Sequence, residues 1–259
     1  MKKRTPQGLL LLFPILLLLL QLASDAAVAS WYCPRNKAHR QPIFGGDLSV
    51  VEEYGGFYID RTHGNTSEEK VVYLTFDAGY ENGNVEKTLD ILKQMQTQGA
   101  FFVLQHLLSA NGELVKRMVA EGHTVCNHTA THKDLSRAKE GVIREELEAL
   151  EKSYEELIGA AIPRYFRPPE GKFSTEMLKV VSEMGYKTVF WSFAYADWDN
   201  ARQMSPQKAM QCVMDNIHNG AVILLHPTSA TNVEILPRVI AELKEQGYRF
   251  GSLDELCGA

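Results

Sequence analysis

The sequence predicts an α/β fold in the form of a closed or partly closed barrel of about seven βα units. From residue 71 onward, short β-branched and aromatic runs alternate with amphipathic helical patterns, which is typical of parallel βα units. Four motifs with polar side chains fall at or just after the ends of the predicted strands, where barrel active sites form. The alternative is an open doubly wound sheet, but no Gly-x-Gly-x-x-Gly motif opens the first helix to indicate a dinucleotide site.

The first 29 residues have the three parts of a secretory signal peptide. A basic start over residues 2–4 precedes an apolar run over residues 9–20, and residues 27–29 have the small-x-small form of a signal peptidase site. The alternative is an uncleaved membrane anchor, but the apolar run is shorter than the ~20 residues that span a bilayer. We therefore expect cleavage near Ala29 and export of the protein.

The remaining chain is expected to form an N-terminal extension and one domain. Residues 30–70 contain Pro34, Pro42 and glycine turns but few periodic apolar positions, so we expect an irregular extension that wraps the domain. Residues 71–259 are long enough for a single barrel domain. Strands are predicted over residues 71–76, 100–103, 123–126, 165–166, 187–190 and 221–225.

The helices of this domain are predicted from apolar periodicity and from start and stop residues. Val85, Leu89 and Leu92 lie on one face of the first helix, which Gly99 ends. Pro206 starts a later helix. The predicted helices span residues 85–98, 114–120, 139–157, 175–184, 206–217 and 234–245.

Charge and cysteine content exclude two function classes. A net charge of −5 gives no basic footprint for nucleic acid. The four cysteines include no Cys-x-x-Cys pair, which excludes a cysteine zinc site. Cys126 lies in a predicted strand and Cys212 in a predicted helix, which favours buried free thiols. Cys33 and Cys257 could pair in an exported protein, and the sequence leaves this open.

Four motifs hold the reactive side chains, and one of them contains two histidines. The motifs are Thr-Phe-Asp-Ala-Gly-Tyr (75–80), His-Thr-Ala-Thr-His (128–132), Arg-Pro-Pro-Glu-Gly (167–171) and Leu-Leu-His-Pro (224–227). The spacing of His128 and His132 puts both imidazoles on one side of a helix or a tight loop, and neutral imidazoles suit zinc and related ions. On its own, such a pair is more often an ordinary polar feature of the surface. Asn127 and Thr129 could hydrogen-bond the two rings.

The other three polar residues each have an ordinary structural explanation. Asp77 could cap a turn, Arg167 could form a structural ion pair, and His226 could be a hydrogen-bonded core histidine. Their co-occurrence favours a shared site, because each follows an otherwise apolar strand and all would face one rim. A carboxylate, two histidines at metal-ligand spacing, an arginine and a third histidine are the parts of a metal-assisted amide hydrolase.

In order and spacing, these motifs resemble those of the polysaccharide deacetylases, the NodB-homology family or carbohydrate esterase family 4. The resemblance covers residues 71–250. It implies a distorted (β/α) barrel of the NodB type and removal of acetyl groups from N-acetylated sugars with a divalent metal ion. Asp77 resembles the general base, Arg167 the residue that orients it, and His226 the acid that protonates the leaving amine. His128 and His132 resemble the metal ligands.

The resemblance also implies which residues contact the substrate. Leu224 and Trp198 would line the pocket for the acetyl methyl group. The backbone N–H of Glu170, which follows Pro169, would hold the oxyanion of the tetrahedral intermediate. Tyr80 is expected among the substrate contacts.

Two positions depart from the family pattern. Ala78 stands where the second Asp of Asp-Asp-Gly usually ligates the metal, and Ala194 stands where the first Asp of Asp-x-x-Asp-Trp is usual. The site keeps two protein ligands, so we expect a weakly held ion, zinc in the first place and manganese or cobalt as alternatives. Asp197 is left as the partner of His226.

Residues 56–58, 76–83 and 189–198 resemble a subgroup, the δ-lactam-biosynthetic de-N-acetylases of spore-forming bacteria. That subgroup acts on N-acetylmuramic acid of peptidoglycan after the peptide has been removed, and the freed amine can cyclise to the muramic-δ-lactam of spore cortex. The likeness implies peptidoglycan glycan strands as substrate, a peptide-stripping muramoyl amidase as functional partner, and a monomer in the cell envelope. Lys172 and Arg202 are candidates to hold the lactyl carboxylate.

Two alternatives stay open. The chain could deacetylate N-acetylglucosamine in peptidoglycan or chitin, although those branches usually keep the Asp that Ala78 replaces. It could also be a catalytically silent glycan-binding domain, although retention of both Asp77 and His226 argues against that.

Overall fold

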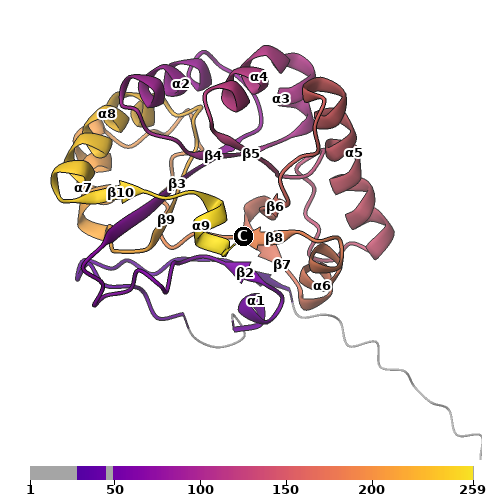
Figure 1. Cartoon of the computed structure of the whole chain (residues 1–259), viewed down its shortest axis with the longest axis horizontal. Coiled ribbons are helices and arrows are strands. Elements are labelled where there is room, and N and C mark those ends of the chain that lie inside the picture. The colour runs from indigo at the N-terminus through magenta and orange to yellow at the C-terminus, as the bar shows by residue number, and fades with distance from the viewer. Residues whose placement is uncertain (1–27, 45–48, 259) are drawn as a thin grey trace, which may run out of the picture.

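A curled parallel sheet lies at the centre of the structure (Figure 1). The computed structural model describes residues 28–44 and 49–258. Within them the strands follow the order β10-β3-β4-β5-β6-β8-β2, and β9 pairs with β3. The strands of this sheet are β2 (Gly56–Phe57), β3 (Lys70–Ala78), β4 (Ala100–Val103), β5 (Thr124–Asn127), β6 (Tyr165–Phe166), β8 (Lys187–Val189), β9 (Ala221–Leu225) and β10 (Tyr248–Phe250).

The long strand β3 organises the barrel. It pairs in parallel with β4 through Thr75–Ala78, with β9 through Val72–Phe76 and with β10 through its first residues. Beyond β8 the chain forms a parallel bridge between Phe193 and Ile223 of β9, so the curled sheet closes on itself. This arrangement confirms the predicted distorted α/β barrel.

Except for α9, which packs in the barrel interior, the helices surround the sheet on its outer side (Figure 1). Most of them alternate with the strands along the chain, as parallel βα units require. They are α1 (Ser49–Glu53), α2 (Val85–Gln94), α3 (Gln105–Ala110), α4 (Gly112–Ala120), α5 (Glu140–Ile158), α6 (Thr175–Glu183), α7 (Pro206–Asn216), α8 (Ala230–Glu245) and α9 (Leu253–Cys257), with a short 3₁₀ turn, η2 (Pro169–Gly171).

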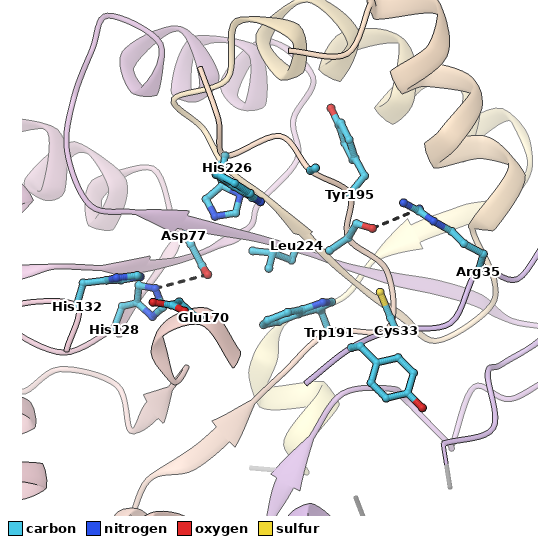
Figure 2. Close-up of a pocket in the computed structure, with 14 residues that line it drawn as sticks. Cys33, Arg35, Asp77, His128, His132, Glu170, Trp191, Tyr195, Leu224 and His226 are labelled. Atoms are coloured by element: carbon cyan, nitrogen blue, oxygen red, sulfur yellow. Dashed lines mark hydrogen bonds and ion pairs between the residues drawn. The ribbon is translucent and has the colours of Figure 1, made fainter. Parts of the chain in front are cut away.

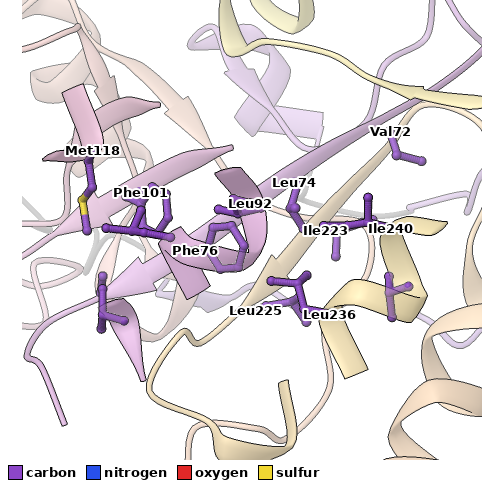
Figure 3. Close-up of a cluster of buried hydrophobic side chains, with 14 of the residues drawn as sticks. Val72, Leu74, Phe76, Leu92, Phe101, Met118, Ile223, Leu225, Leu236 and Ile240 are labelled. Carbon is purple, nitrogen blue, oxygen red and sulfur yellow. The ribbon is translucent and has the colours of Figure 1, made fainter. Parts of the chain in front are cut away.

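Alternation along β3 separates two apolar layers. Leu74 and Phe76 face the helices, where they pack with Leu92 of α2 and Leu236 of α8 (Figure 3). Residues of the other parity, such as Tyr73, face the barrel interior. Since Asp77 has this second parity, the strand pattern itself points the carboxylate inward.

Several element boundaries differ from the sequence predictions. The first helix ends at Gln94 and not at residue 98, because Gln96 has a left-handed backbone with φ 49°. The last long helix begins at Ala230, four residues early, because Ser229 accepts a hydrogen bond from Asn232 N and caps it. The short elements α3, β10 and α9 were not predicted.

The N-terminal extension, expected to be irregular, contributes short regular elements to the fold. β1 (Ala29–Ser30) pairs antiparallel with β7 (Lys172–Phe173), and β2 pairs with β8. Of the predicted signal peptide, residues 1–27 lie outside the described residues. No helix within residues 28–44 and 49–258 is long and apolar enough to cross a bilayer.

The four cysteines are free thiols in the structure. Cys126 and Cys257 are buried, and Cys33 and Cys212 are half-buried. Cys257, the last residue of α9, packs in the barrel interior. Cys33 instead lines a cavity that Asp77 and His226 also line. The Cys33–Cys257 disulfide that the sequence left open is therefore not formed.

Candidate active site

Asp77, near the end of β3, is held by a buried arginine. Arg167 directly follows β6, and its Nη1 donates to Asp77 Oδ1 at 2.7 Å. The guanidinium is fully buried and also donates from Nη2 to Thr75 Oγ1 and from Nε to the carbonyl of Val189. It lies 4.0 Å over the ring of Phe102. These contacts fix the arginine, so it can orient the carboxylate.

The charge of Asp77 depends on its neighbours. Burial alone would raise the pKa of this carboxyl, but the positive charge of Arg167, with smaller contributions from His128 and His226, lowers it below its ordinary value. Asp77 is therefore ionised near neutral pH. An ionised carboxylate with only Oδ1 bonded to Arg167 can accept a proton at Oδ2.

His128 directly follows β5 and presents its Nε2 to the same place. Its Nδ1 lies 2.8 Å from the carbonyl oxygen of Arg167, so Nδ1–H is the donor and Nε2 keeps its lone pair. Nε2 is 3.6 Å from Asp77 Oδ2. Burial lowers the pKa of His128 to about 4, which keeps the ring neutral. A neutral imidazole with a fixed Nδ1 is the form that ligates metals.

A tight loop, and not a helix, brings His132 back to His128. Thr129 and His132 have positive φ angles of 75° and 60°. The amide N–H of Thr129 donates to Asn127 Oδ1, and that of His132 donates to Thr129 Oγ1. Asn127 and Thr129 therefore support the loop backbone and do not bond the imidazole rings, as the sequence suggested they could. The two ring centroids are 5.0 Å apart.

The two imidazoles fit a divalent ion with open coordination positions. His128 Nε2 is unprotonated, and the ring of His132 stands beside it at 69°. Ala78 supplies no ligand atom, and no group of three or more His, Cys, Asp and Glu side chains with metal-binding geometry occurs in the described part of the chain. The protein donor set is thus two nitrogens, which leaves positions for water and substrate.

His226 follows β9 and is held by a buried carboxylate. Its Nδ1 lies 2.7 Å from Asp197 Oδ1, and its backbone N–H donates to Asp197 Oδ2 at 2.8 Å. Asn232 of α8 donates to Asp197 Oδ2 and to the carbonyl of His226. Asp197 is 1% exposed, so these contacts satisfy a charge that water does not reach.

The environment of His226 favours its protonated form. Burial would lower its pKa, but the hydrogen bond and the charge of Asp197, together with the charge of Asp77, raise the pKa above its ordinary value. Because Nδ1 faces Asp197, Nε2 is the nitrogen left to donate a proton. His226 thus has the partner and the charge of a general acid.

A cavity of about 730 Å³ joins these side chains (Figure 2). Asp77, His128, His132 and His226 all line it, and Figure 2 shows His226 beside Asp77. The other lining residues are Tyr32, Cys33, Arg35, Glu170, Trp191, Ala194, Tyr195, Ala196, Trp198 and Leu224.

The predicted substrate contacts fall into two groups. Glu170, Trp198 and Leu224 line the cavity; Leu224 is buried, whereas Trp198 is 63% exposed. Tyr80 and Pro169 do not line it. The Tyr80 hydroxyl accepts a hydrogen bond from Asn200, and Pro169 is buried in η2. Leu224 is therefore the better apolar surface for a methyl group.

Sequence reasoning missed one wall of the cavity. Tyr32, Cys33 and Arg35 belong to the extension, and Trp191 and Tyr195 follow β8. Tyr32 belongs to no period or motif, and Trp191 and Tyr195 were noted only as part of the resembling stretch 189–198, without a role of their own. Arg35 is one of many surface-type basic residues in the sequence, and only its position in the fold distinguishes it.

Comparisons with known proteins agree with this geometry. The family model for polysaccharide deacetylases matches residues 64–189. The chain is 41% identical over 228 residues to the peptidoglycan-N-acetylmuramic acid deacetylase PdaA of Bacillus subtilis, covering 88% of this chain and 85% of that protein. It is 31% identical over 195 residues to a peptidoglycan-N-acetylglucosamine deacetylase of Bacillus cereus, covering 73% of this chain and 89% of that protein.

Among solved structures, that of Bacillus subtilis PdaA, described as a family 4 carbohydrate esterase, has a TM-score of 0.83 and 39% identity. The likeness covers 88% of this chain and 96% of the other. The chain therefore belongs to the polysaccharide deacetylase family, the family 4 carbohydrate esterases, and is an amide hydrolase.

Proposed function

We propose that this chain removes the acetyl group from N-acetylmuramic acid units of peptidoglycan strands that have lost their stem peptide. The observation that carries the proposal is the placement of Asp77 and His226 on one cavity, each held by a buried partner. The choice of muramic acid is supported by the higher identity to the N-acetylmuramic acid deacetylase than to the N-acetylglucosamine deacetylase, 41% against 31%.

The reaction needs a base and an acid on the two sides of one amide bond. A divalent ion held by His128 and His132 would polarise the acetyl carbonyl and lower the pKa of the attacking water. The oxygen of the water molecule attacks the carbonyl carbon, and Asp77 accepts a proton from this water molecule in the same step. Arg167 keeps the carboxylate in place, and Glu170 lies on the cavity wall where its backbone could support the oxyanion.

His226 completes the reaction. When the carbon–nitrogen bond breaks, the leaving amine takes the proton of His226 Nε2, and acetate is released. Asp197 stabilises the imidazolium before the transfer and orients the ring throughout. The hydrogen bond from Asn232 prevents Asp197 from rotating away.

Family members are generally metal-dependent, and for this chain we infer zinc, with manganese or cobalt as alternatives. Two imidazole nitrogens suit a zinc ion. Ala78 supplies no third protein ligand, so the ion is weakly held and is lost to chelators.

The proposed setting is the cell envelope, after export and cleavage near Ala29. There the enzyme acts as a monomer on glycan strands from which a muramoyl amidase has removed the peptide. The freed amine can then cyclise onto the lactyl carboxyl group, which gives the muramic-δ-lactam of spore cortex.

A substrate panel tests the proposal. Wild-type protein with zinc is given peptide-free glycan strands, peptide-bearing strands and chitin oligosaccharides, and mass spectrometry assigns the sugars that lose acetyl. We expect loss from muramic units of the peptide-free strands. Loss of acetyl from glucosamine units alone would show that the protein is an N-acetylglucosamine deacetylase instead. No loss of acetyl from any of the three substrates would favour a catalytically silent glycan-binding domain.

A further inference from the structure

One wall of the cavity comes from the N-terminal extension, ahead of the region that matches the family model. We call residues 32–35 the N-terminal wall; Tyr32, Cys33 and Arg35 of this wall line the cavity. The family match begins at residue 64. The N-terminal wall therefore lies ahead of the matched region, in the extension, and lines the same cavity as Asp77 and His226.

The N-terminal wall is anchored at both ends. On one side Trp31 is buried: its backbone N–H donates to Gly171, and its Nε1 donates to the carbonyl of Trp191, both at 2.8 Å. On the other side the backbone N–H of Asn36 donates to Asn216 Oδ1 at 2.9 Å. Two fixed ends over so short a segment hold its side chains against the cavity.

Within the described residues, Arg35 is the one arginine or lysine that lines this cavity, and it has no carboxylate partner there. The two carboxylates of the cavity are already paired, Asp77 with Arg167 and Glu170 with Lys172. The positive charge of Arg35 is thus left available to a ligand.

The guanidinium of Arg35 is placed by weak contacts and keeps free donors. Nη1 lies 3.4 Å from the carbonyl of Ala194 and 3.2 Å from Cys212 Sγ, and the group stands 5.9 Å from the ring of Phe193. Nε and Nη2 have no hydrogen-bond partner in the described part of the chain. These two nitrogens form the edge that binds a carboxylate with two parallel hydrogen bonds.

The two basic residues that the sequence suggested for this role are less suitable. Lys172 bonds Asp134 and Glu170, and neither it nor Arg202 lines the cavity. Arg202 is paired with Asp199 and is largely exposed. Figure 2 shows Arg35 across the cavity from His128 and His132, with Leu224 and Trp191 between them.

We propose that Arg35 binds a lactyl carboxylate of the glycan and so selects muramic acid units. This inference rests on the proposed function, because only a muramic unit without its peptide presents that carboxylate. The carboxylate belongs either to the sugar that loses acetyl or to the next muramic unit along the strand. In both cases the chemistry is a guanidinium–carboxylate pair at the rim of the cavity.

The test compares two versions of each substrate. One is a peptide-free disaccharide or tetrasaccharide of alternating glucosamine and muramic units with free lactyl carboxylates; the other has these carboxyls converted to primary amides. Values of kcat and KM are measured for wild type, Arg35→Gln and Arg35→Lys. Arg40→Gln is the matched control, because it makes the same change at an exposed position of the same extension that does not line the cavity.

For wild type we expect kcat/KM to be roughly tenfold higher on the carboxylate substrate, mainly through KM. Arg35→Gln should remove this preference, Arg35→Lys should keep part of it, and Arg40→Gln should behave as wild type. A preference already present with the disaccharide assigns the carboxylate to the reacting sugar, and one that appears only with the tetrasaccharide assigns it to the neighbouring unit.

Two results would overturn the role of Arg35 while leaving the proposed function in place. One is that wild type deacetylates muramic units without preferring the carboxylate; the other is that Arg35→Gln, with an unchanged melting temperature, keeps the wild-type preference. If wild type deacetylates only glucosamine units, the proposed function fails, and the role of Arg35 fails with it.

Discussion

At the scale of single residues, buried partners set the protonation states of the two reacting groups. Arg167 lowers the pKa of Asp77 in spite of its burial, and Asp197 raises the pKa of His226 in spite of its burial. In each case the pKa moves in the direction opposite to the one that burial alone would produce: that of Asp77 is lowered and that of His226 is raised. A base without a proton and an acid with one can therefore face the same cavity at one pH.

The raised pKa of His226 leads to a pH prediction. The acid must be protonated, so activity should persist as the pH rises until the pKa of His226 is reached. In Asp197→Asn the loss of the negative charge lowers that pKa, and the basic limb of the kcat–pH profile should move to lower pH. Asp199→Asn, which alters a carboxylate of the same segment outside the cavity, is the control. An unchanged basic limb in Asp197→Asn would rule out His226 as the acid.

Metal binding should depend on His132 although this residue is exposed. His132→Ala leaves His128 as the sole imidazole ligand, so zinc affinity should fall at least ~10-fold. Competition titration with a chromophoric chelator measures the change. His106→Ala removes an exposed histidine of α3 that is outside the cavity and should have no effect. Equal zinc affinity of His132→Ala and wild type would exclude His132 as a ligand.

At the scale of elements, the N-terminal extension depends on one aromatic anchor. The ring of Trp31 stacks on Phe190 at 4.5 Å and on Phe44 at 4.9 Å between centroids. The neighbouring Tyr32 is 61% exposed. Consecutive aromatic residues of this extended segment thus have different roles, one in the core and one at the cavity.

This difference predicts unequal effects on stability. Trp31→Ala should lower the free energy of unfolding by about 3–5 kcal/mol, because it removes a buried ring and leaves a void. Tyr32→Ala should change it by no more than about 0.5 kcal/mol. Urea unfolding followed by circular dichroism measures both. Similar losses in the two variants would show that the extension is not anchored by Trp31.

How much of these elements the sequence could predict depends on their length. The helix expected over residues 139–157 was found almost unchanged as α5, since a long amphipathic period leaves little choice. β2 has two residues and is defined by its pairing with β8, which no local pattern encodes. The reactive motifs were found because their residue types are unusual at strand ends, whereas Arg35 reaches the cavity only through the path of the extension.

At the scale of the whole molecule, the curled sheet brings distant parts of the chain into one cavity. Asp77, His128, Arg167 and His226 follow or end four different strands, and their carboxyl ends meet at one rim. The placement of the motifs at the ends of strands therefore predicted a common site once the parallel barrel was inferred. α9 packs in the interior beside the first half of β3, away from Asp77 near its end.

The most direct measurement is the number of free amines on muramic units after digestion of peptide-free glycan by wild type, Asp77→Asn and His226→Ala. Mass spectrometry assigns each amine to its sugar, and circular dichroism confirms that the variants are folded. We expect free amines on muramic units with wild type and a rate lower by ~10²–10⁴-fold in each variant. Activity of either variant within a factor of a few of wild type, or amines on glucosamine units instead, would contradict the account.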